Sequence, residues 1–321
     1  MRRQSGRLVI LMILLFLLPA FGSPVKTSRI RKVGKAPNFF ALSPGGGKIY
    51  ATSFGTDELL EVDLAQKLVT RVVQVGSSPL GLAVTDDGKT ALVANRDSGT
   101  VSVVNLDTFE VVEDIRVGGF PNSIAIGRRG YRAYVTNYGR SRDGQFHIID
   151  IRERSVIATM KMGVAPFALA ISPVADLVYV IMGGSNEVWI VDPEKQEIVR
   201  KIAVGEGPDG IAITPDGKRV FVANSRSNDL SVIDTQLMKV LVTVPIGKMP
   251  FGVAVSPDGK KVFVVNNASR NVSIIPADLS SLDFETFSVD RGPTDVKVGP
   301  DNRTVYVINE LSNSLVVAEI D

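Results

Sequence analysis

The feature that most constrains this chain is a short motif that occurs seven times. It consists of an apolar residue, usually followed by a glycine, then two variable residues and a proline. The prolines are Pro37, Pro79, Pro121, Pro166, Pro208, Pro250 and Pro293, so successive copies lie 42, 42, 45, 42, 42 and 43 residues apart. A fixed period of about 40 residues is the signature of a repeat architecture, whose units bury their apolar faces against one another. The spacing predicts one repeat domain over residues 23–321, with copies beginning near residues 33, 75, 117, 162, 204, 246 and 289.

The copy around Pro208 indicates what each unit contains. Residues 210–214, 220–224, 230–233 and 240–246 form short apolar or alternating runs, and the first two are separated by the turn sequence Pro-Asp-Gly-Lys. Proline presets one backbone angle of such a turn and glycine accepts a positive φ. Four short runs with closely spaced turns predict a meandering antiparallel sheet of four strands.

Each predicted first strand carries a small residue next to a large one. The six pairs are Ala41 and Leu42, Ala83 and Val84, Ala125 and Ile126, Ala170 and Ile171, Ala212 and Ile213, and Ala254 and Val255. Successive side chains of a strand point to opposite faces, so each sheet has a small face and a bulky face that fit its neighbours. We expect seven stacked sheets that close into a ring. An open solenoid is the alternative, but it normally needs polar capping repeats, and none is visible.

The two ends of the chain indicate how the ring closes. The last copy has strands at 294–298, 304–309 and 315–319 and lacks a fourth, whereas residues 28–33 form a spare strand before the first copy. We therefore expect residues 28–33 to pair with the last sheet. The predicted fold is an all-β, seven-bladed β-propeller of four-stranded antiparallel blades, whose ring is closed by an N-terminal strand that completes the last blade.

The second strand of the third copy reads Tyr134-Val135-Thr136-Asn137, and the other copies are variants of it. The chain thus resembles the YVTN family of β-propeller repeats over residues 28–321. This resemblance implies the propeller architecture and an exported or cell-surface prokaryotic protein. It implies no particular activity, because most of the family has no assigned function.

The N-terminus has the order of a secretory signal peptide. Three arginines within residues 2–7 precede an uncharged apolar run at 8–18, and small residues flank a cleavage point at 20–22. We expect residues 1–22 to be removed, by the general export route rather than the twin-arginine route, leaving a periplasmic, surface or secreted protein without a transmembrane segment. An uncleaved anchor is the alternative, but the apolar run is shorter than the roughly 20 residues that a spanning helix needs.

Composition excludes several classes of function. Without the three leader arginines, 33 basic side chains face 34 acidic ones, so no global field attracts nucleic acid or an anionic membrane. The absence of cysteine excludes disulfides, thiolate metal sites and a cysteine nucleophile. His147 is the only histidine, which excludes a His-rich metal site, and we expect it to be structural within a third strand. We expect no cofactor, no catalytic residue and no metal site, although calcium binding is left open.

Asparagine ends the second strand in five copies, at Asn95, Asn137, Asn224, Asn266 and Asn309. Such recurrence favours a structural role over ligand binding, and we expect the side chains to bond to loop backbone, as asparagine does at turns. Positions that break the repeat are better candidates for a site.

Three breaks are evident: the third copy is three residues longer, Met182 replaces the asparagine of the fourth copy, and Lys297 replaces the alanine of the seventh. For Lys297, the sequence favours an ion pair with Asp295 or Asp209, because a charge near the inner strand needs a partner. The alternative is a charge at the ring axis that holds an anionic ligand. The candidate ligand-binding residues, on or near the face formed by loops into the first strands and between the second and third, are Arg96, Tyr138, Arg140, Arg142, Asp209, Arg226, Asp295 and Lys297.

Three functions remain open from the sequence. The favoured one is a monomeric, non-catalytic binding platform that holds a protein, a glycan or a small molecule in the cell envelope. The second is an enzyme, for example of the lactonase type, since some lactonases have a seven-bladed ring. The third is a structural component of the cell surface.

Overall fold

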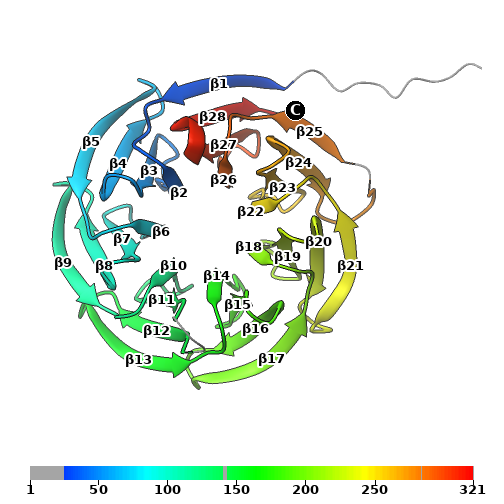
Figure 1. Cartoon of the computed structure of the whole chain (residues 1–321), viewed down its shortest axis with the longest axis horizontal. Helices are drawn as coiled ribbons and strands as arrows, with labels where there is room; N and C mark the ends of the chain where they lie inside the picture. Colours follow the sequence, from blue (N-terminus) through cyan, green and yellow to red (C-terminus); the bar gives the residue numbers. More distant parts are fainter. Residues whose placement is uncertain (1–24, 140–142, 283, 321) are drawn as a thin grey trace, which may run out of the picture.

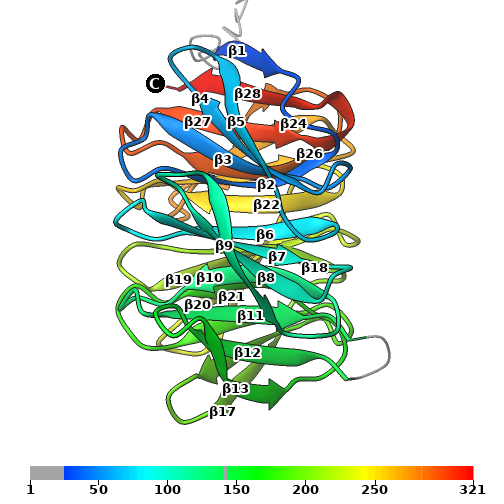
Figure 2. The ribbon, with the colours of Figure 1, turned by 90° about the vertical axis from the view of Figure 1, so that its left-hand side faces the viewer.

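The computed structural model describes residues 25–139, 143–282 and 284–320, and it confirms a ring of seven four-stranded antiparallel blades (Figure 1). The predicted leader and Arg140 and Arg142 lie outside the described residues. In each blade the first strand lies at the axis and the fourth at the rim, and Figure 2 shows the blades edge-on. Within the described ranges, no helix has the length and apolar character needed to span a membrane.

The first three blades follow one another directly along the chain. Blade 1 contains β2 (Pro37–Leu42), β3 (Lys48–Ser53), β4 (Glu58–Asp63) and β5 (Leu68–Gln74). Blade 2 contains β6 (Pro79–Val84), β7 (Thr90–Asn95), β8 (Thr100–Asn105) and β9 (Glu110–Arg116). Blade 3 contains β10 (Pro121–Ile126), β11 (Arg132–Asn137), β12 (Gln145–Asp150) and β13 (Ser155–Lys161).

The remaining blades continue the same order. Blade 4 contains β14 (Pro166–Ile171), β15 (Val178–Met182), β16 (Glu187–Asp192) and β17 (Glu197–Ala203). Blade 5 contains β18 (Pro208–Ile213), β19 (Arg219–Asn224), β20 (Asp229–Asp234) and β21 (Lys239–Pro245). Blade 6 contains β22 (Pro250–Val255), β23 (Lys261–Asn266), β24 (Asn271–Pro276) and a short β25 (Glu285–Ser288). Blade 7 contains β26 (Pro293–Val298), β27 (Thr304–Asn309), β28 (Ser314–Glu319) and β1 (Lys26–Arg31), with a 3₁₀ turn, η1 (Glu310–Ser312), after β27.

Every first strand begins at the proline of the repeated motif, so the motif marks the start of each blade at the axis. The glycine three residues earlier has a steric reason in several blades. A Cβ on Gly76 or Gly205 would lie 2.7 or 2.6 Å from the side-chain amide of Asn95 or Asn224. Real Cβ atoms do not approach other atoms so closely, so the glycine and the buried asparagine depend on each other.

The expected bonding of these asparagines to loop backbone is wrong for most of them. In three blades the amide donates to a serine hydroxyl of the third strand at 2.7–2.9 Å: Asn95 to Ser102, Asn224 to Ser231 and Asn266 to Ser273. Asn309 donates to carbonyl groups of its own sheet, those of Val307 and Ser314. Asn137 does bond to loop backbone, with its amide 2.6 Å from the carbonyl oxygen of Gly118. In these three blades the serine of the third strand thus replaces loop backbone as the acceptor.

The core consists of one buried apolar cluster between each pair of neighbouring blades. Between blades 2 and 3, Ala83 of β6 and Ile126 of β10 pack against the same cluster. Between blades 5 and 6, Ala212 and Val255 do the same. The bulky face of one blade therefore meets the small face of the previous blade, as the paired residues predict.

The N-terminal strand closes the ring as expected, although its bounds differ from the predicted 28–33. Strand β1 covers Lys26–Arg31 and pairs antiparallel with β28 along its whole length (Figure 1). Ile30 and Val33 are buried in the cluster between blades 7 and 1. The backbone of Val33 and Ala36 is also bonded to Asn313, at 3.1 and 2.9 Å. Residues from the two ends of the chain thus share one sheet and one core.

Candidate functional site

A pocket of about 390 Å³ opens on the axis at the face formed by the loops into the first strands. The residue that follows each proline points to it, and we call these seven residues the mouth ring: Asn38, Leu80, Asn122, Phe167, Asp209, Phe251 and Thr294. Arg96, Tyr138 and Glu310, which follow second strands, line the same pocket. The two sets of loops therefore meet on one face, which we call the loop face.

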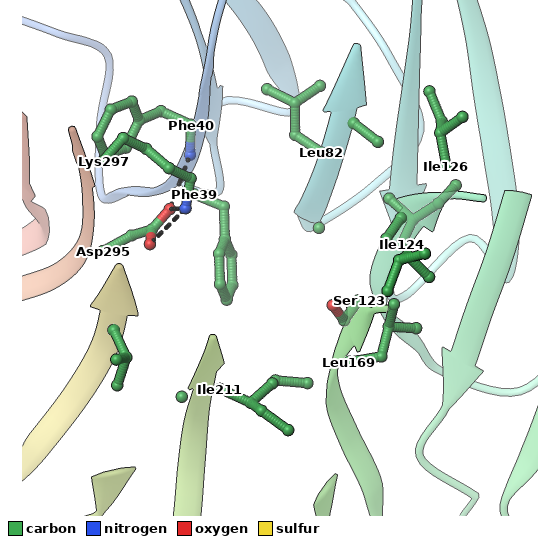
Figure 3. Close-up of a pocket in the computed structure, with 18 of the residues that line it drawn as sticks. Phe39, Phe40, Leu82, Ser123, Ile124, Ile126, Leu169, Ile211, Asp295 and Lys297 are labelled. Atoms are coloured by element: carbon green, nitrogen blue, oxygen red, sulfur yellow. Dashed lines mark hydrogen bonds and ion pairs between the residues drawn. The ribbon is translucent and has the colours of Figure 1, made fainter. Parts of the chain in front are cut away.

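A second cavity of about 510 Å³ continues from this mouth along the axis. Phe39, Asp209 and Thr294 line both cavities, so they stand where the mouth passes into the tunnel. Leu82, Ile124, Ile126, Leu169 and Ile211 provide an apolar wall, and Asp295 with Lys297 provides a charged wall opposite (Figure 3). The tunnel thus has an apolar wall that faces the ion pair, and Asp209, Asp86 and Arg128 are the other charged residues that line it among the described residues.

Lys297 forms the ion pair that the sequence favours, and its partner is Asp295 rather than Asp209. The Lys297 ammonium lies 2.8 and 2.7 Å from the two carboxylate oxygens of Asp295 (Figure 3). Asp295 is buried and also accepts hydrogen bonds from the backbone N–H groups of Val296, at 2.9 Å, and Phe40, at 3.5 Å. The Lys297 ammonium lies 5.5 Å from the centre of the Phe40 ring in blade 1. The pair therefore links blade 7 to blade 1, and its positive charge is largely neutralised.

Asp209 differs from every other member of the mouth ring because it is charged. It lines the mouth, the tunnel and an adjacent groove of about 420 Å³. Within the described residues its carboxylate has no hydrogen-bond or ion-pair partner. Crowding by neighbouring protein atoms raises the pKa of Asp209 to about 7, because desolvation disfavours the charged form, although the residue keeps partial contact with solvent in the pocket wall.

The structure brings together three of the other predicted residues around Asp209. Tyr138 lines both the mouth and the groove, and Arg226 lines the groove. Arg96 lines the mouth, where its guanidinium lies 5.9 Å from the centre of the Phe120 ring and 4.0 Å from Asp97. Arg96 and Asp97 are about half exposed, so their attraction is weak.

Two other positions that the sequence singled out belong to the core. Met182 is fully buried and packs in one cluster with Trp189. A Cβ on Gly163 would lie 3.1 Å from Trp189 and 3.6 Å from Met182, so in blade 4 the glycine faces this pair instead of an asparagine. The candidacy of Met182 as a functional position is therefore wrong.

His147 is also part of the interior of its sheet. Its ring lies 3.0 Å from the hydroxyl of Thr159 and 3.3 Å from the amide of Asn137. Burial lowers the pKa of His147 to about 4, which keeps the ring neutral at ordinary pH. These contacts support the structural role expected from the sequence. Across the described residues, no group of three or more potential metal ligands occurs.

The sequence interpretation missed the aromatic residues of the mouth. Phe39, Phe120, Phe167 and Phe251 all line the pocket. Three of them occupy the first or second position after a proline, which the repeat leaves variable. A comparison of these positions across the seven copies could have found them, because the residue that follows each proline turns toward the axis in every blade.

Comparisons with known proteins agree with this architecture. Residues 165–275 match the family model described as YNCE-like beta-propeller. The chain is 30% identical over 116 residues to the seven-bladed beta-propeller protein Rv1057 of Mycobacterium tuberculosis, covering 36% of this chain and 29% of that protein. It is 23% identical over 161 residues to Antigen Lp49 of Leptospira interrogans, covering 48% and 35%. The matched segments thus span about a third of the length of these relatives.

Among solved structures, a chain of Kuenenia stuttgartiensis hydrazine synthase has the same fold. It superposes with a TM-score of 0.81 at 23% identity and covers 88% of this chain and 95% of that one. At this identity the likeness concerns the fold alone. The seven blades and the comparisons together show a seven-bladed β-propeller that is similar to YNCE-like propellers over residues 165–275.

Proposed function

We propose that this propeller is an exported, non-catalytic binding protein whose loop face holds a partner in the cell envelope. The observation that carries the proposal is the mouth pocket, where aromatic side chains from several blades surround a few polar groups. Concave sites lined by apolar and aromatic side chains, with a small number of fixed polar groups, are typical of ligand binding. The leader sequence supports export.

The polar groups near the axis favour binding over catalysis. Lys297 is held by Asp295, and His147 lies within the sheet of blade 3 rather than at the mouth. An acid–base mechanism needs groups that can exchange protons with a substrate in the cavity. Among the described charged residues near the axis, Asp209 alone combines an unpaired carboxyl with a pKa of about 7.

That carboxyl gives specific support to a second candidate function, a lactonase-like or other hydrolytic enzyme with Asp209 as general base. A general base works best when its pKa lies near the working pH. Hydrolysis of simple lactones or esters by the purified protein, lost in Asp209→Asn, would establish this alternative. If no substrate is turned over, the binding function stands.

The binding function is tested by capture of a partner from a cell-envelope extract. Tyr138 is 46% exposed at the loop face, and Leu237 is 58% exposed in the turn between β20 and β21, on the opposite face. We expect the wild type and Leu237→Ala to retain the same defined component and Tyr138→Ala to lose most of it. Equal retention by all three proteins would contradict a loop-face site. Mass spectrometry of the exported protein should place its N-terminus near residue 23.

A further inference from the structure

The mouth ring contains a carboxylate flanked by two aromatic rings. Phe167, Asp209 and Phe251 hold the same position, directly after the proline, in blades 4, 5 and 6. Strands β14, β18 and β22, which carry them, are neighbours around the axis (Figure 1). Asp209 therefore stands between two phenylalanines in the wall of the mouth pocket, and Phe39 lines the mouth and the tunnel together with Asp209.

The charged side chains that the structure describes around Asp209 leave its carboxylate uncompensated. The neighbouring strands β14 and β22 contain no charged residue. Lys297, across the tunnel, is bound by both oxygens of Asp295. Arg226 shares the groove with Asp209, but no ion pair joins the two side chains in the part of the chain that the structure describes. The charged residues that line the mouth pocket are two acidic ones, Asp209 and Glu310, and one basic one, Arg96.

We propose that the mouth pocket binds an organic ammonium ion, with its nitrogen at the Asp209 carboxylate and its carbon substituents against Phe167, Phe251 and Phe39. The inference rests on the proposed function, in which the loop face is a binding surface. It specifies the chemistry of the ligand, or of the partner's contacting group, at the axis.

Two independent features of the pocket favour this chemistry. A poorly hydrated carboxylate gains most from a cation that brings its own charge and hydrogen-bond donors. The faces of aromatic rings attract cations and also cover the apolar part of such a ligand. An anion would meet two carboxylates in the mouth, and a neutral ligand would form no charge-assisted hydrogen bond with Asp209. A volume of about 390 Å³ is in the range of small-molecule sites.

The test uses benzylammonium as the probe and benzyl alcohol as its neutral counterpart of similar shape. Binding to the purified, full propeller is measured by isothermal titration calorimetry or by NMR line shifts. We expect saturable binding of benzylammonium, with benzyl alcohol weaker by about ten-fold or more, a difference equivalent to one charge-assisted contact. The variant Asp209→Asn, which keeps the shape of the side chain, should lose about the same factor.

The matched control is Glu206→Gln, which removes one negative charge from an exposed side chain in the loop before β18. It should bind benzylammonium like the wild type, and thermal melts verify that both variants are folded. The inference is overturned if amine and alcohol bind equally, if Asp209→Asn binds as tightly as the wild type, or if benzylammonium does not bind at millimolar concentration. The capture experiment with Tyr138→Ala is independent. A partner retained through Tyr138 without ammonium binding would overturn this inference alone, whereas ammonium binding through Asp209 without any retained partner would overturn the envelope function alone.

Discussion

Closure of the ring by β1 predicts that a single buried side chain of this strand controls the stability of the whole propeller. Ile30 is 2% exposed and packs with Leu60 of blade 1 and Ile308 and Leu315 of blade 7. Ile30→Ala removes buried carbon atoms and leaves a cavity at the joint between the first and last blades. Changes of this kind cost about 2–5 kcal/mol, and the cost should appear in global unfolding because β1 joins the two ends of the ring.

The matched control is Ile157→Ala. Ile157 lies in the outer strand β13 and is 48% exposed, so its replacement should change the free energy of unfolding by less than about 0.5 kcal/mol. Guanidinium unfolding followed by circular dichroism gives both values, and a thermal melt should show a Tm lower by roughly 5–10 °C for Ile30→Ala. Deletion of residues 25–33 should destabilise the protein further, since it removes the pairing with β28. If Ile30→Ala unfolds at the same denaturant concentration as Ile157→Ala, β1 does not hold the ring closed.

Three further predictions concern buried polar groups and close packing. Burial lowers the pKa of His147 to about 4, so the unfolded chain gains a proton at higher pH than the folded one and stability should fall as the pH drops from about 6.5 to 4, by up to about 3 kcal/mol. His147→Gln should flatten that fall in urea unfolding at several pH values, and an unchanged slope would show that His147 is not its source. A Cβ on Gly247 would lie 2.6 Å from the amide nitrogen of Asn266, so Gly247→Ala should cost about 1–3 kcal/mol. Gly45→Ala, with no atom within 4 Å of the new Cβ, should be nearly neutral, and equal melting temperatures for the two variants would contradict the steric argument. Lys297→Met leaves Asp295 buried without its cation and should cost about 1–3 kcal/mol, because the half-exposed lysine makes the pair weaker than a fully buried one. The double variant Lys297→Met/Asp295→Asn should recover part of that loss in the same melt, and no recovery would show that the charge of Asp295 is not responsible.

Most of the fold was predictable because its determinants are local and repeated. The prolines mark the first strands, and alanine next to a larger residue indicates two faces that must be covered by neighbouring sheets. Residues 28–33 could be assigned to the last blade because one strand was missing at the other end. The observed bounds of β1 (Lys26–Arg31) differ because pairing with β28, rather than the apolar pattern, determines where the strand begins and ends.

The candidate site was predictable only in part. A break in the repeat drew attention to Lys297, for which an ion pair with Asp295 or Asp209 was expected, and the structure has the pair with Asp295. The same reasoning wrongly proposed Met182 as a functional position, although Met182 packs in the core together with Trp189. It also predicted that the asparagine side chains bond to loop backbone, although three of them donate to a serine hydroxyl of the third strand.

By itself, the sequence determined the number of blades, the order of strands within them and the way the ring closes, because each follows from a pattern within about 40 residues or from a count of strands. The tertiary structure decided which side chains from different blades lie together at the axis. Phe39 and Asp209 lie far apart in the chain, and they line the same cavities only after seven blades have closed into a ring. The first strands converge there at a distance and an angle that no single repeat specifies. The placement of the Asp209 carboxylate among aromatic rings is therefore a property of the closed ring, not of any one copy.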